Sequence, residues 1–333
     1  MKSIEKESNY IKGVVSSGIR LLSIDVYKGL MIAFAIFINA TSYFQYSPIW
    51  NKGSELYGLT YVDLFGPFFL FALTMTFATS YHRRLEKIGK IRTYKHFLRR
   101  FSLYILIGFL ITLEIEPSGI TLRWGTLQML GIAGIFLLLT INIRTKIKII
   151  LSFGLIIFHQ IVNLQLFLPY IIGIPHGGIP GLLSWFSFAL IASVLNEYFM
   201  KTKNMLIYGI TGVSFFVLGL IMNLLITISR QLLNTTFISI CLGLSIVVYL
   251  LLFEIFENLT HKYQWIKREK YLSVLGKNTL FLYILQSFFK YISYFLLPID
   301  TLPFIFFSFG ILMVSLNFLL AYSLDRYQIY LVV

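Results

Sequence analysis

Apolar residues form ten long runs along the chain, separated by short polar segments or by breaks rich in proline and glycine. Most of these runs reach the roughly 20 residues that a helix needs to cross the hydrocarbon core of a membrane. A backbone that crosses lipid must satisfy its own hydrogen bonds, which a helix does. The pattern therefore predicts an all-α fold, a polytopic membrane bundle of about ten transmembrane helices. The predicted helices cover residues 23–44, 60–81, 101–115, 124–142, 147–168, 182–200, 205–229, 236–256, 273–296 and 303–323.

Two breaks between the runs are unusual. The segment from Pro169 to Gly181, PYIIGIPHGGIPG, holds too much proline and glycine for a regular helix and is too apolar for an ordinary wet loop. Irregular backbone at membrane depth is tolerated where it lines a cavity or is buried in protein, so we expect a re-entrant segment that walls a site. The stretch from Glu114 to Trp124 contains a Pro-Ser-Gly break and predicts an irregular turn.

Basic residues set the predicted orientation. The segment from His82 to Arg100 carries eight Lys or Arg residues and is expected in the cytoplasm. With ten helices and this segment inside, 22 basic residues fall on the cytoplasmic side and four outside, and both termini are cytoplasmic. We expect a cytoplasmic segment over residues 1–20, a transmembrane domain over 21–326 and a cytoplasmic tail over 327–333.

Composition supports the membrane interpretation. The chain is 57% hydrophobic and 13% charged, with a mean hydropathy of +0.80, which a soluble core does not accommodate. The net charge of +14 is explained by the basic residues on the cytoplasmic side of the membrane, so no nucleic-acid partner is expected. Membrane lipids are expected partners, and the predicted location is the cell membrane. The single cysteine, Cys241, excludes a disulfide framework and a cysteine metal site, and no metal is expected.

Polar residues at the start of the first helix are candidates for binding an anionic donor. Arg20, Asp25 and Lys28 are expected at its cytoplasmic end, near Arg83 and Arg84. The structural alternative is that Asp25 pairs with a basic neighbour and that Lys28 extends to the lipid headgroups. Both interpretations remain open from the sequence.

Asp63 and two histidines are candidates for acid–base chemistry at the outer face. Asp63 lies one turn inside the second helix, where it caps the helix, pairs with Arg123 or faces a cavity. His159 lies within the fifth helix, and His176 lies in the Pro-His-Gly-Gly turn. A lone histidine is more often structural, yet each of the two is a plausible general base. Arg123 and Gln128 lie at the start of the fourth helix. They are five residues apart, so they need not face one pocket.

Five segments together resemble the transmembrane acyltransferase family typified by heparan-α-glucosaminide N-acetyltransferase and its prokaryotic relatives. They occur in the family order and are scattered over most of the chain. These segments are RLLSIDVYKGLMIAFAIFINA (20–40), GLTYVDLFGPFFLFAL (58–73), TLRWGTLQMLGIAGIFLLL (121–139), HGGIPGLLSWFSFALIAS (176–193) and LSVLGKNTLFLYILQ (272–286).

The resemblance implies transfer of an acetyl or similar acyl group from cytosolic acyl-CoA to an amine or hydroxyl of a glycan outside. Asn39 matches the family's acceptor-side asparagine, and Trp50 lies in the acceptor-side segment before the second helix. The family histidine of that segment has no counterpart here. Other relatives carry a histidine where Gln128 or Gln286 stands.

We therefore predict an acyl-CoA-dependent acyltransferase, with acetyl-CoA or another acyl-CoA as the expected donor. Arg20, Lys28, Arg83, Arg84 and Lys277 are expected to hold its phosphates. Asn39 would hold the acceptor or the oxyanion, with His176, His159 or Asp63 as base. Transfer is either direct or passes through an acyl-histidine at His159 or His176. The alternative is a transporter or an inactive binder of a lipid-linked or glycan substrate. The oligomeric state is open, with a homodimer as one alternative.

Overall fold

The computed structural model describes residues 21–116, 119–259, 263, 266 and 269–330. Eight helices among these residues are long and apolar enough to cross a membrane, and a ninth apolar helix, over Thr126–Thr140, is shorter. The chain is therefore a helical membrane protein, as the hydrophobic pattern predicts. Arg20 and the rest of the predicted segment 1–20 lie outside the described residues.

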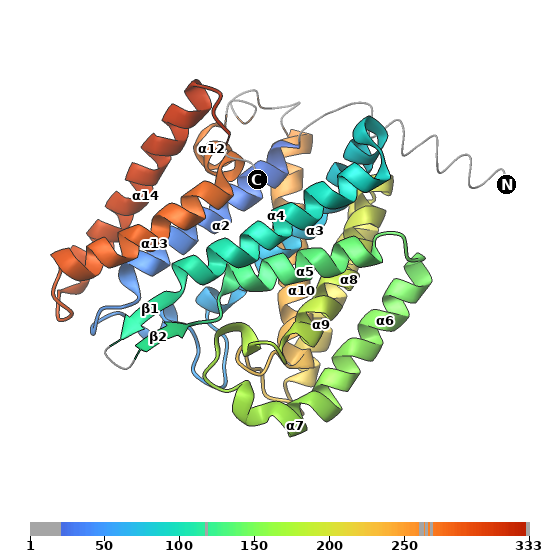
Figure 1. Cartoon of the computed structure of the whole chain (residues 1–333), viewed down its shortest axis with the longest axis horizontal. Coiled ribbons are helices and arrows are strands. Elements are labelled where there is room, and N and C mark those ends of the chain that lie inside the picture. The colour runs from blue at the N-terminus through green and yellow to red at the C-terminus, as the bar shows by residue number, and fades with distance from the viewer. Residues whose placement is uncertain (1–20, 117–118, 260–262, 264–265, 267–268, 331–333) are drawn as a thin grey trace. The chain divides into compact units, whose positions relative to one another are not determined.

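Helices dominate the described part of the chain, with one β-hairpin (Figure 1). The elements before the hairpin are α2 (Leu22–Thr41), the 3₁₀ turns η1 (Ile49–Asn51) and η2 (Tyr61–Leu64), α3 (Phe65–Ile88) and α4 (Lys90–Ile111). The hairpin consists of β1 (Leu113–Glu116) and β2 (Gly119–Leu122). After it come α5 (Thr126–Thr140), α6 (Thr145–Phe158), the π-helical turn η3 (His159–Asn163), α7 (Leu164–Phe167), and the 3₁₀ turns η4 (Leu168–Tyr170) and η5 (Pro175–Gly177). The last are α8 (Leu182–Thr202), α9 (Met205–Met222), α10 (Thr235–Phe253), the π-helical turn η6 (Glu254–Asn258), α12 (Tyr271–Lys277), α13 (Thr279–Leu296) and α14 (Pro303–Arg326).

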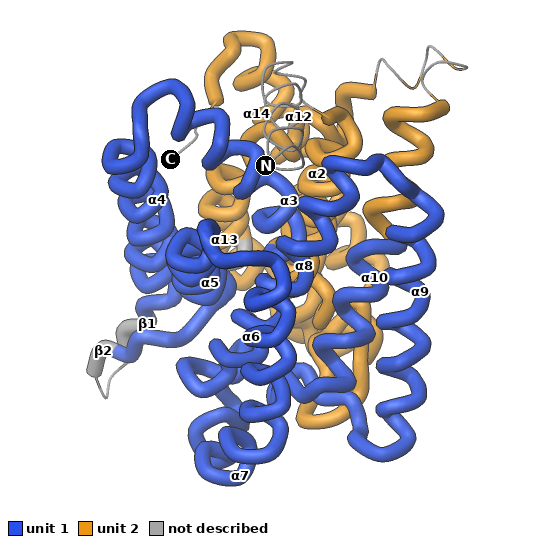
Figure 2. Tube along the Cα trace, turned by 90° about the vertical axis from the view of Figure 1, so that its right-hand side faces the viewer, with its two compact units in different colours: residues 1–20, 70–247 blue, residues 21–69, 248–333 orange. Residues whose placement is uncertain are grey.

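The helices form two compact units, which Figure 2 colours separately. Among the described residues, unit 1 comprises 70–247 and unit 2 comprises 21–69 together with 248–333. The chain passes between the units within α3 and again within α10.

Aromatic side chains fill the interior of unit 1 between α3 and α4. Phe77 contacts Phe97 edge-on, with ring centroids 5.3 Å apart, and Phe101 lies next to both rings. Gly134 of α5 packs directly on the ring of Phe101, where a Cβ atom would collide with it. Small residues allow helices to approach closely in membranes, where dispersion contacts replace the hydrophobic driving force. The glycine in α5 therefore places this helix against α4.

Unit 2 is built around α2, against which α12, α13 and α14 pack. Two glycines make the α2–α12 crossing unusually close. A Cβ atom on Gly29 would collide with the carbonyl oxygen of Leu272, and one on Gly276 with the carbonyl oxygen of Asp25. The two backbones are therefore in direct contact at this crossing.

Three sequence expectations about secondary structure are corrected. The basic segment 82–100 is not a loop, because α3 continues to Ile88 and α4 begins at Lys90, with Gly89 at φ 78° between them. The predicted helix 273–296 is divided at Asn278 into α12 and α13. The stretch expected as an irregular turn forms the antiparallel hairpin, with Leu113 opposite Leu122.

The segment 171–181 is irregular, as its proline and glycine content predicts. Outside the short turn η5 it contains turns, and three successive residues from His176 to Gly178 have positive φ values. Ile171 and Gly177 are nevertheless buried. These buried positions anchor the segment on unit 1, whereas residues 172–175 and 179 are exposed.

Candidate functional site

His176 is held in a backbone conformation that side-chain-bearing residues rarely adopt. Its φ and ψ angles are 54° and 26°, in the left-handed region, which costs a residue other than glycine roughly 1–2 kcal/mol. The indole nitrogen of the fully buried Trp185 in α8 donates a hydrogen bond of 3.1 Å to the His176 carbonyl oxygen. Gly181 lies against the same carbonyl, which leaves no room for a Cβ atom there. The start of α8 thus holds the strained residue in place.

The ring of His176 faces a hydroxyl group. Its Nε2 lies 2.9 Å from the Oγ1 of Thr126, the first residue of α5. Trp185 flanks the ring, with centroids 5.8 Å apart. A hydroxyl within hydrogen-bond reach of an imidazole is the arrangement that activates a hydroxyl nucleophile or orients a general base.

The surroundings of His176 keep its ring neutral. Burial, together with the nearby Arg230 guanidinium, lowers the pKa of His176 to about 4. At neutral pH the imidazole is therefore unprotonated and able to accept a proton. This is the protonation state that a general base requires.

Both ring nitrogens of His159 form hydrogen bonds. The residue is fully buried, and its Nε2 lies 2.8 Å from the carbonyl oxygen of Leu232, to which it donates. The amide of Asn163 donates to Nδ1 at 2.8 Å and also to the carbonyl oxygen of Pro180. The π-helical turn η3 places both side chains on this network. These hydrogen bonds join the segments around residues 180 and 232 to η3. The ring of His159 therefore has a structural role.

Gln128 is buried on the face of α5 opposite to Thr126, since residues two apart on a helix point about 200° apart. Its amide nitrogen donates to Thr112 Oγ1 at 2.9 Å and to the carbonyl oxygen of Arg123 at 3.2 Å. Its Oε1 has no hydrogen-bond partner among the described residues, and neither has the indole nitrogen of Trp124. Arg123 is exposed. Gln128 and the Arg123 backbone therefore meet, while His176 lies on another side of α5.

Arginines gather around His96 at the junction of α3 and α4. Burial lowers the pKa of His96, and the positive charges of Arg84, Arg100 and Arg99 lower it further. The Nε atom of Arg83 is buried and has no hydrogen-bond partner among the described residues. The junction is thus a cationic region of unit 1, where an anion would relieve the repulsion between like charges.

The helix α8 connects the neighbourhood of His176 with this basic side of the unit. Near its far end, Glu197 pairs with the buried Lys148 of α6 at 3.5 Å and lies close enough to interact electrostatically with His82, the residue before Arg83 on α3. Twelve residues separate Glu197 from Trp185, which corresponds to about 18 Å along a helix. One rigid element therefore relates the two regions within unit 1.

In unit 2, the polar residues at the start of α2 are mutually satisfied. Asp25 is buried and pairs with Lys28 at 3.2 Å. The backbone nitrogen and hydroxyl of Ser23 both donate to the same carboxylate oxygen of Glu257, each at 2.9 Å. The structural alternative expects Asp25 to pair with a basic neighbour, and in the structure that neighbour is Lys28, which the same alternative instead directs to the lipid headgroups.

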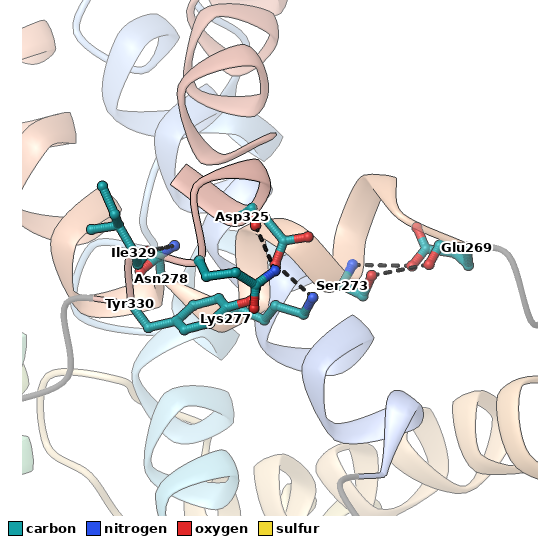
Figure 3. Close-up of polar contacts among 8 residues, drawn as sticks. Glu269, Ser273, Lys277, Asn278, Asp325, Ile329 and Tyr330 are labelled. Atoms are coloured by element: carbon teal, nitrogen blue, oxygen red, sulfur yellow. Dashed lines mark hydrogen bonds and ion pairs between the residues drawn. The ribbon is translucent and has the colours of Figure 1, made fainter. Parts of the chain in front are cut away.

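Lys277 is also paired, as Figure 3 shows. Its ammonium group donates to Asp325 Oδ1 at 2.7 Å and lies 5.9 Å from the ring centre of Tyr330. The hydroxyl of Tyr330 donates to the same carboxylate oxygen at 2.8 Å. Asn278 contacts the carbonyl oxygen of Ile329 at 3.4 Å. The segment that follows α14 therefore covers the break between α12 and α13.

Asp63 forms hydrogen bonds that stabilise the segment around Ser54 and Thr60, before α3. Its carboxylate accepts hydrogen bonds from the backbone nitrogens of Ser54 and Thr60 and from the Thr60 hydroxyl, over 2.8–3.2 Å. Together with Thr60 it forms a capping box at η2. This arrangement is the capping role that the sequence offered as one alternative.

Trp50 and Asn39 lie near the same end of α2 but in different surroundings. Trp50 is 56% exposed, and its ring stacks parallel to Phe307 with centroids 5.9 Å apart. Phe307 also stacks on Phe37 of α2. Asn39 is half-buried, its side-chain amide forms no hydrogen bond with the described residues, and it points about 200° away from Phe37 on the helix. Gln286 of α13 is buried, and its Oε1 has no partner among the described residues.

Of the residues that the sequence predicts, the structure groups His176, His159, Arg83, Arg84, Arg123 and Gln128 in unit 1, and Asn39, Asp63, Asp25, Lys28, Trp50, Lys277 and Gln286 in unit 2. Three residues around His176 were missed. Thr126, Trp185 and Arg230 lie 50, 9 and 54 positions away from it in the chain. The only sequence signal was the position of Thr126 at the start of a predicted helix, which is more often a capping position.

No protein-family model matches the chain, and no curated protein matches it significantly.

Proposed function

We propose that the chain is a membrane acyltransferase that moves an acetyl or similar acyl group from cytosolic acyl-CoA to an amine or hydroxyl of an extracytoplasmic sugar. In this proposal ten helices cross the cell membrane and both termini are cytoplasmic. The β-hairpin, the start of α5 and segment 171–181 then face outward. The resemblance of the five sequence segments to the acyltransferase family is consistent with this assignment.

The observation that carries the proposal is the contact between His176 and Thr126. A neutral imidazole 2.9 Å from a hydroxyl is suited to proton transfer during acyl transfer, and burial with a nearby arginine keeps it neutral. The strained backbone of His176 adds support, because residues in sparsely populated backbone conformations cluster at active sites. His176 takes the role of the acceptor-side base, for which the family histidine has no counterpart.

The donor side of the proposal rests on the arginines at the α3–α4 junction. Arg83, Arg84, Arg99 and Arg100 lie in the segment with the highest density of basic residues, and arginine binds phosphate through paired hydrogen bonds. Lys28 and Lys277 are less suited, because each already pairs with a carboxylate. Within unit 1, donor phosphates would lie at the basic end and the acceptor at the other.

The unit 2 residues take secondary roles in this proposal. Asn39 has a side-chain amide with no partner among the described residues, which leaves it able to bind a polar group within unit 2. The exposed ring of Trp50 suits contact with a sugar ring at the outer face. Asp63 and His159 are assigned to structure rather than chemistry, because their polar atoms are already engaged.

A non-catalytic binder or transporter is the second candidate. The observation that favours it is the structural use of His159 and Asp63, which leaves fewer groups for chemistry. Such a protein would bind or move a glycan or lipid-linked substrate without forming an acylated product. Product formation therefore separates the two candidates.

The test uses purified full-length protein in detergent with acetyl-CoA carrying a radiolabelled acetyl group and a panel of amino sugars. The proposal predicts a labelled N-acetyl sugar, and His176→Gln lowers the rate by about 10²–10⁴-fold, the contribution typical of a general base. His82→Gln, a histidine on α3 outside the proposed machinery, is the matched control and keeps the wild-type rate. Absence of labelled sugar with every acceptor, from protein that binds the sugar, supports the non-catalytic candidate.

A further inference from the structure

We infer that Thr126 carries the acyl group covalently, as an ester on its Oγ1, between release of CoA and attack by the acceptor. The inference rests on the proposed acyltransferase function and adds to it the path of the acyl group. It makes Thr126 a catalytic residue and His176 the group that serves both half-reactions.

The hydroxyl of Thr126 contacts a side chain, as does that of Thr235 at the start of α10. By contrast, the hydroxyls of Thr76, Thr140 and Thr211 donate to a backbone carbonyl one turn earlier in their own helix. Such bonds occupy the hydroxyl and are the common arrangement for threonine inside a helix. Thr126 is the first residue of α5, so no earlier turn is present, and its hydroxyl meets the ring nitrogen of His176 instead. Its oxygen is therefore positioned for activation rather than for helix stabilisation.

The partner ring is fixed from several directions. The His176 carbonyl is held by Trp185, whose ring also flanks the imidazole, and Gly181 leaves space for this close approach. A base that is held at hydrogen-bond distance from a hydroxyl, and is itself oriented by further groups, has the geometry shared by nucleophile–base pairs. The pair thus supplies a hydroxyl nucleophile and a base, two of the groups that covalent acyl transfer needs.

The start of α5 supplies the third part. The first N–H groups of a helix have no carbonyl partner within that helix, and Gly125 before α5 provides no side-chain cap. These N–H groups lie next to the oxygen that would become the ester. A negatively charged oxygen that forms during acyl transfer is stabilised by backbone N–H groups in such a position.

The first half-reaction is acylation of the protein. Thr126 Oγ1 attacks the thioester carbonyl carbon of acyl-CoA, a C–O bond forms, and the C–S bond breaks. The hydroxyl proton passes to His176 Nε2 and from there to the departing sulfur, which leaves as the thiol of free CoA. The products are acyl-Thr126, neutral His176 and CoA.

The second half-reaction transfers the group to the sugar. The acceptor amine attacks the ester carbonyl, a C–N bond forms, and the ester C–O bond breaks. One amine proton passes to His176 Nε2 and then to Thr126 Oγ1, which restores the hydroxyl. No redox change occurs in either half-reaction.

The experiment compares wild type with Thr126→Val, which keeps the shape but lacks the hydroxyl, and with Thr126→Ser, which keeps a hydroxyl. Each purified full-length protein receives radiolabelled acetyl-CoA without acceptor, and mass spectrometry of its peptides locates any acetyl group. The wild type and Thr126→Ser are expected to be acetylated at position 126 and to lose the label when amino sugar is added. Thr126→Val is expected to carry no label at position 126 and to lose sugar acetylation.

The outcomes separate this inference from the proposed function. If wild type acetylates the sugar, position 126 stays unlabelled and Thr126→Val matches the wild-type rate, transfer is direct and the inference is overturned while the acyltransferase assignment stands. If wild type neither acetylates a sugar nor becomes labelled, both are overturned. Size-exclusion profiles equal to that of wild type show that the variants are folded.

Discussion

A Cβ atom on Gly29 would lie 3.1 Å from the backbone nitrogen of Gly276, so the helices α2 and α12 cross with their backbones in contact. The same atom would also overlap the carbonyl oxygen of Leu272. Only glycine at both positions permits this approach, because backbone atoms cannot move aside as the end of a flexible side chain can. The crossing holds α12, which carries Lys277 at its end, against the helix that carries Asp25 and Asn39.

The substitutions Gly29→Ala and Gly276→Ala are expected to destabilise the protein by about 1–3 kcal/mol or more, the usual range for overpacking. Gly154→Ala is the control, because a Cβ atom there has nothing within 4 Å and alanine favours a helix. Thermal unfolding in detergent measures the difference. Equal unfolding temperatures for Gly276→Ala and Gly154→Ala would show that the α2 and α12 backbones are not in contact at this crossing.

The rate of acyl transfer is expected to depend on the protonation of His176. Since its pKa is lowered to about 4, the ring is neutral above that value and becomes protonated only as the pH falls through it. The rate should therefore fall in acid with a midpoint near 4, whereas an ordinary histidine would place this midpoint near 6.5. Initial rates measured between pH 4 and pH 6.5 decide between the two cases, because only a solvated histidine would lose activity over this range.

Arg230 is expected to influence this pH dependence through its charge. Its guanidinium disfavours protonation of His176, so Arg230→Gln raises the pKa of His176 and moves the acidic midpoint to higher pH. Arg230→Lys retains the charge and keeps the midpoint near that of the wild type. A midpoint that stays in place for Arg230→Gln would mean that burial alone sets the pKa.

The end of α14 contains a strained residue that glycine would relieve. Gln328 has φ 56°, and the bonds from Gln328 N to Asp325 O and from Ile329 N to Leu324 O form the closing pattern of a Schellman motif. Glycine is the usual residue at this position, so Gln328→Gly is expected to raise stability by about 1 kcal/mol.

Gln328→Ala retains the left-handed strain and is not expected to stabilise the chain. Both variants lose the exposed side-chain bond from Gln328 to the Asp325 carbonyl, so the comparison isolates the backbone effect. Unfolding temperatures in detergent check the order, and a gain for alanine equal to that for glycine would argue against strain at this residue.

Much of the helical layout could be predicted from hydrophobic runs, because burial in lipid or protein demands apolar residues over a fixed length. The same signal failed at residues 82–100. Lys, Arg, Glu and Leu in this segment are good helix formers, so the helices extend beyond the apolar runs until Gly89 interrupts them. Polarity marks where a helix leaves an apolar environment, not where it ends.

The break at Asn278 was not predicted either. The segment Gly276-Lys277-Asn278-Thr279 interrupts the apolar run at this point, but the interruption is too short to separate two predicted helices. The close α2–α12 crossing depends on Gly29 and Gly276, which lie 247 positions apart in the sequence. Tertiary packing of this kind cannot be read from local composition.

The candidate site was predictable in part. His176 was singled out because a histidine between proline and glycine is unusual in an apolar segment, but its partner Thr126 lies 50 positions earlier and resembles an ordinary helix start. His159 looked equivalent in the sequence. Its two ring nitrogens are used by Leu232 and Asn163, and only the folded chain distinguishes the two histidines.

The most direct test of the account is transfer across a sealed membrane. Proteoliposomes containing the purified full-length chain are loaded with acetyl-CoA labelled in its acetyl group, and an amino sugar that does not cross lipid is added outside. The account predicts labelled N-acetyl sugar outside while CoA stays inside, and none with His176→Gln. Labelled sugar that forms only when donor and acceptor share one compartment, or entry of unmodified sugar without labelling, would contradict it.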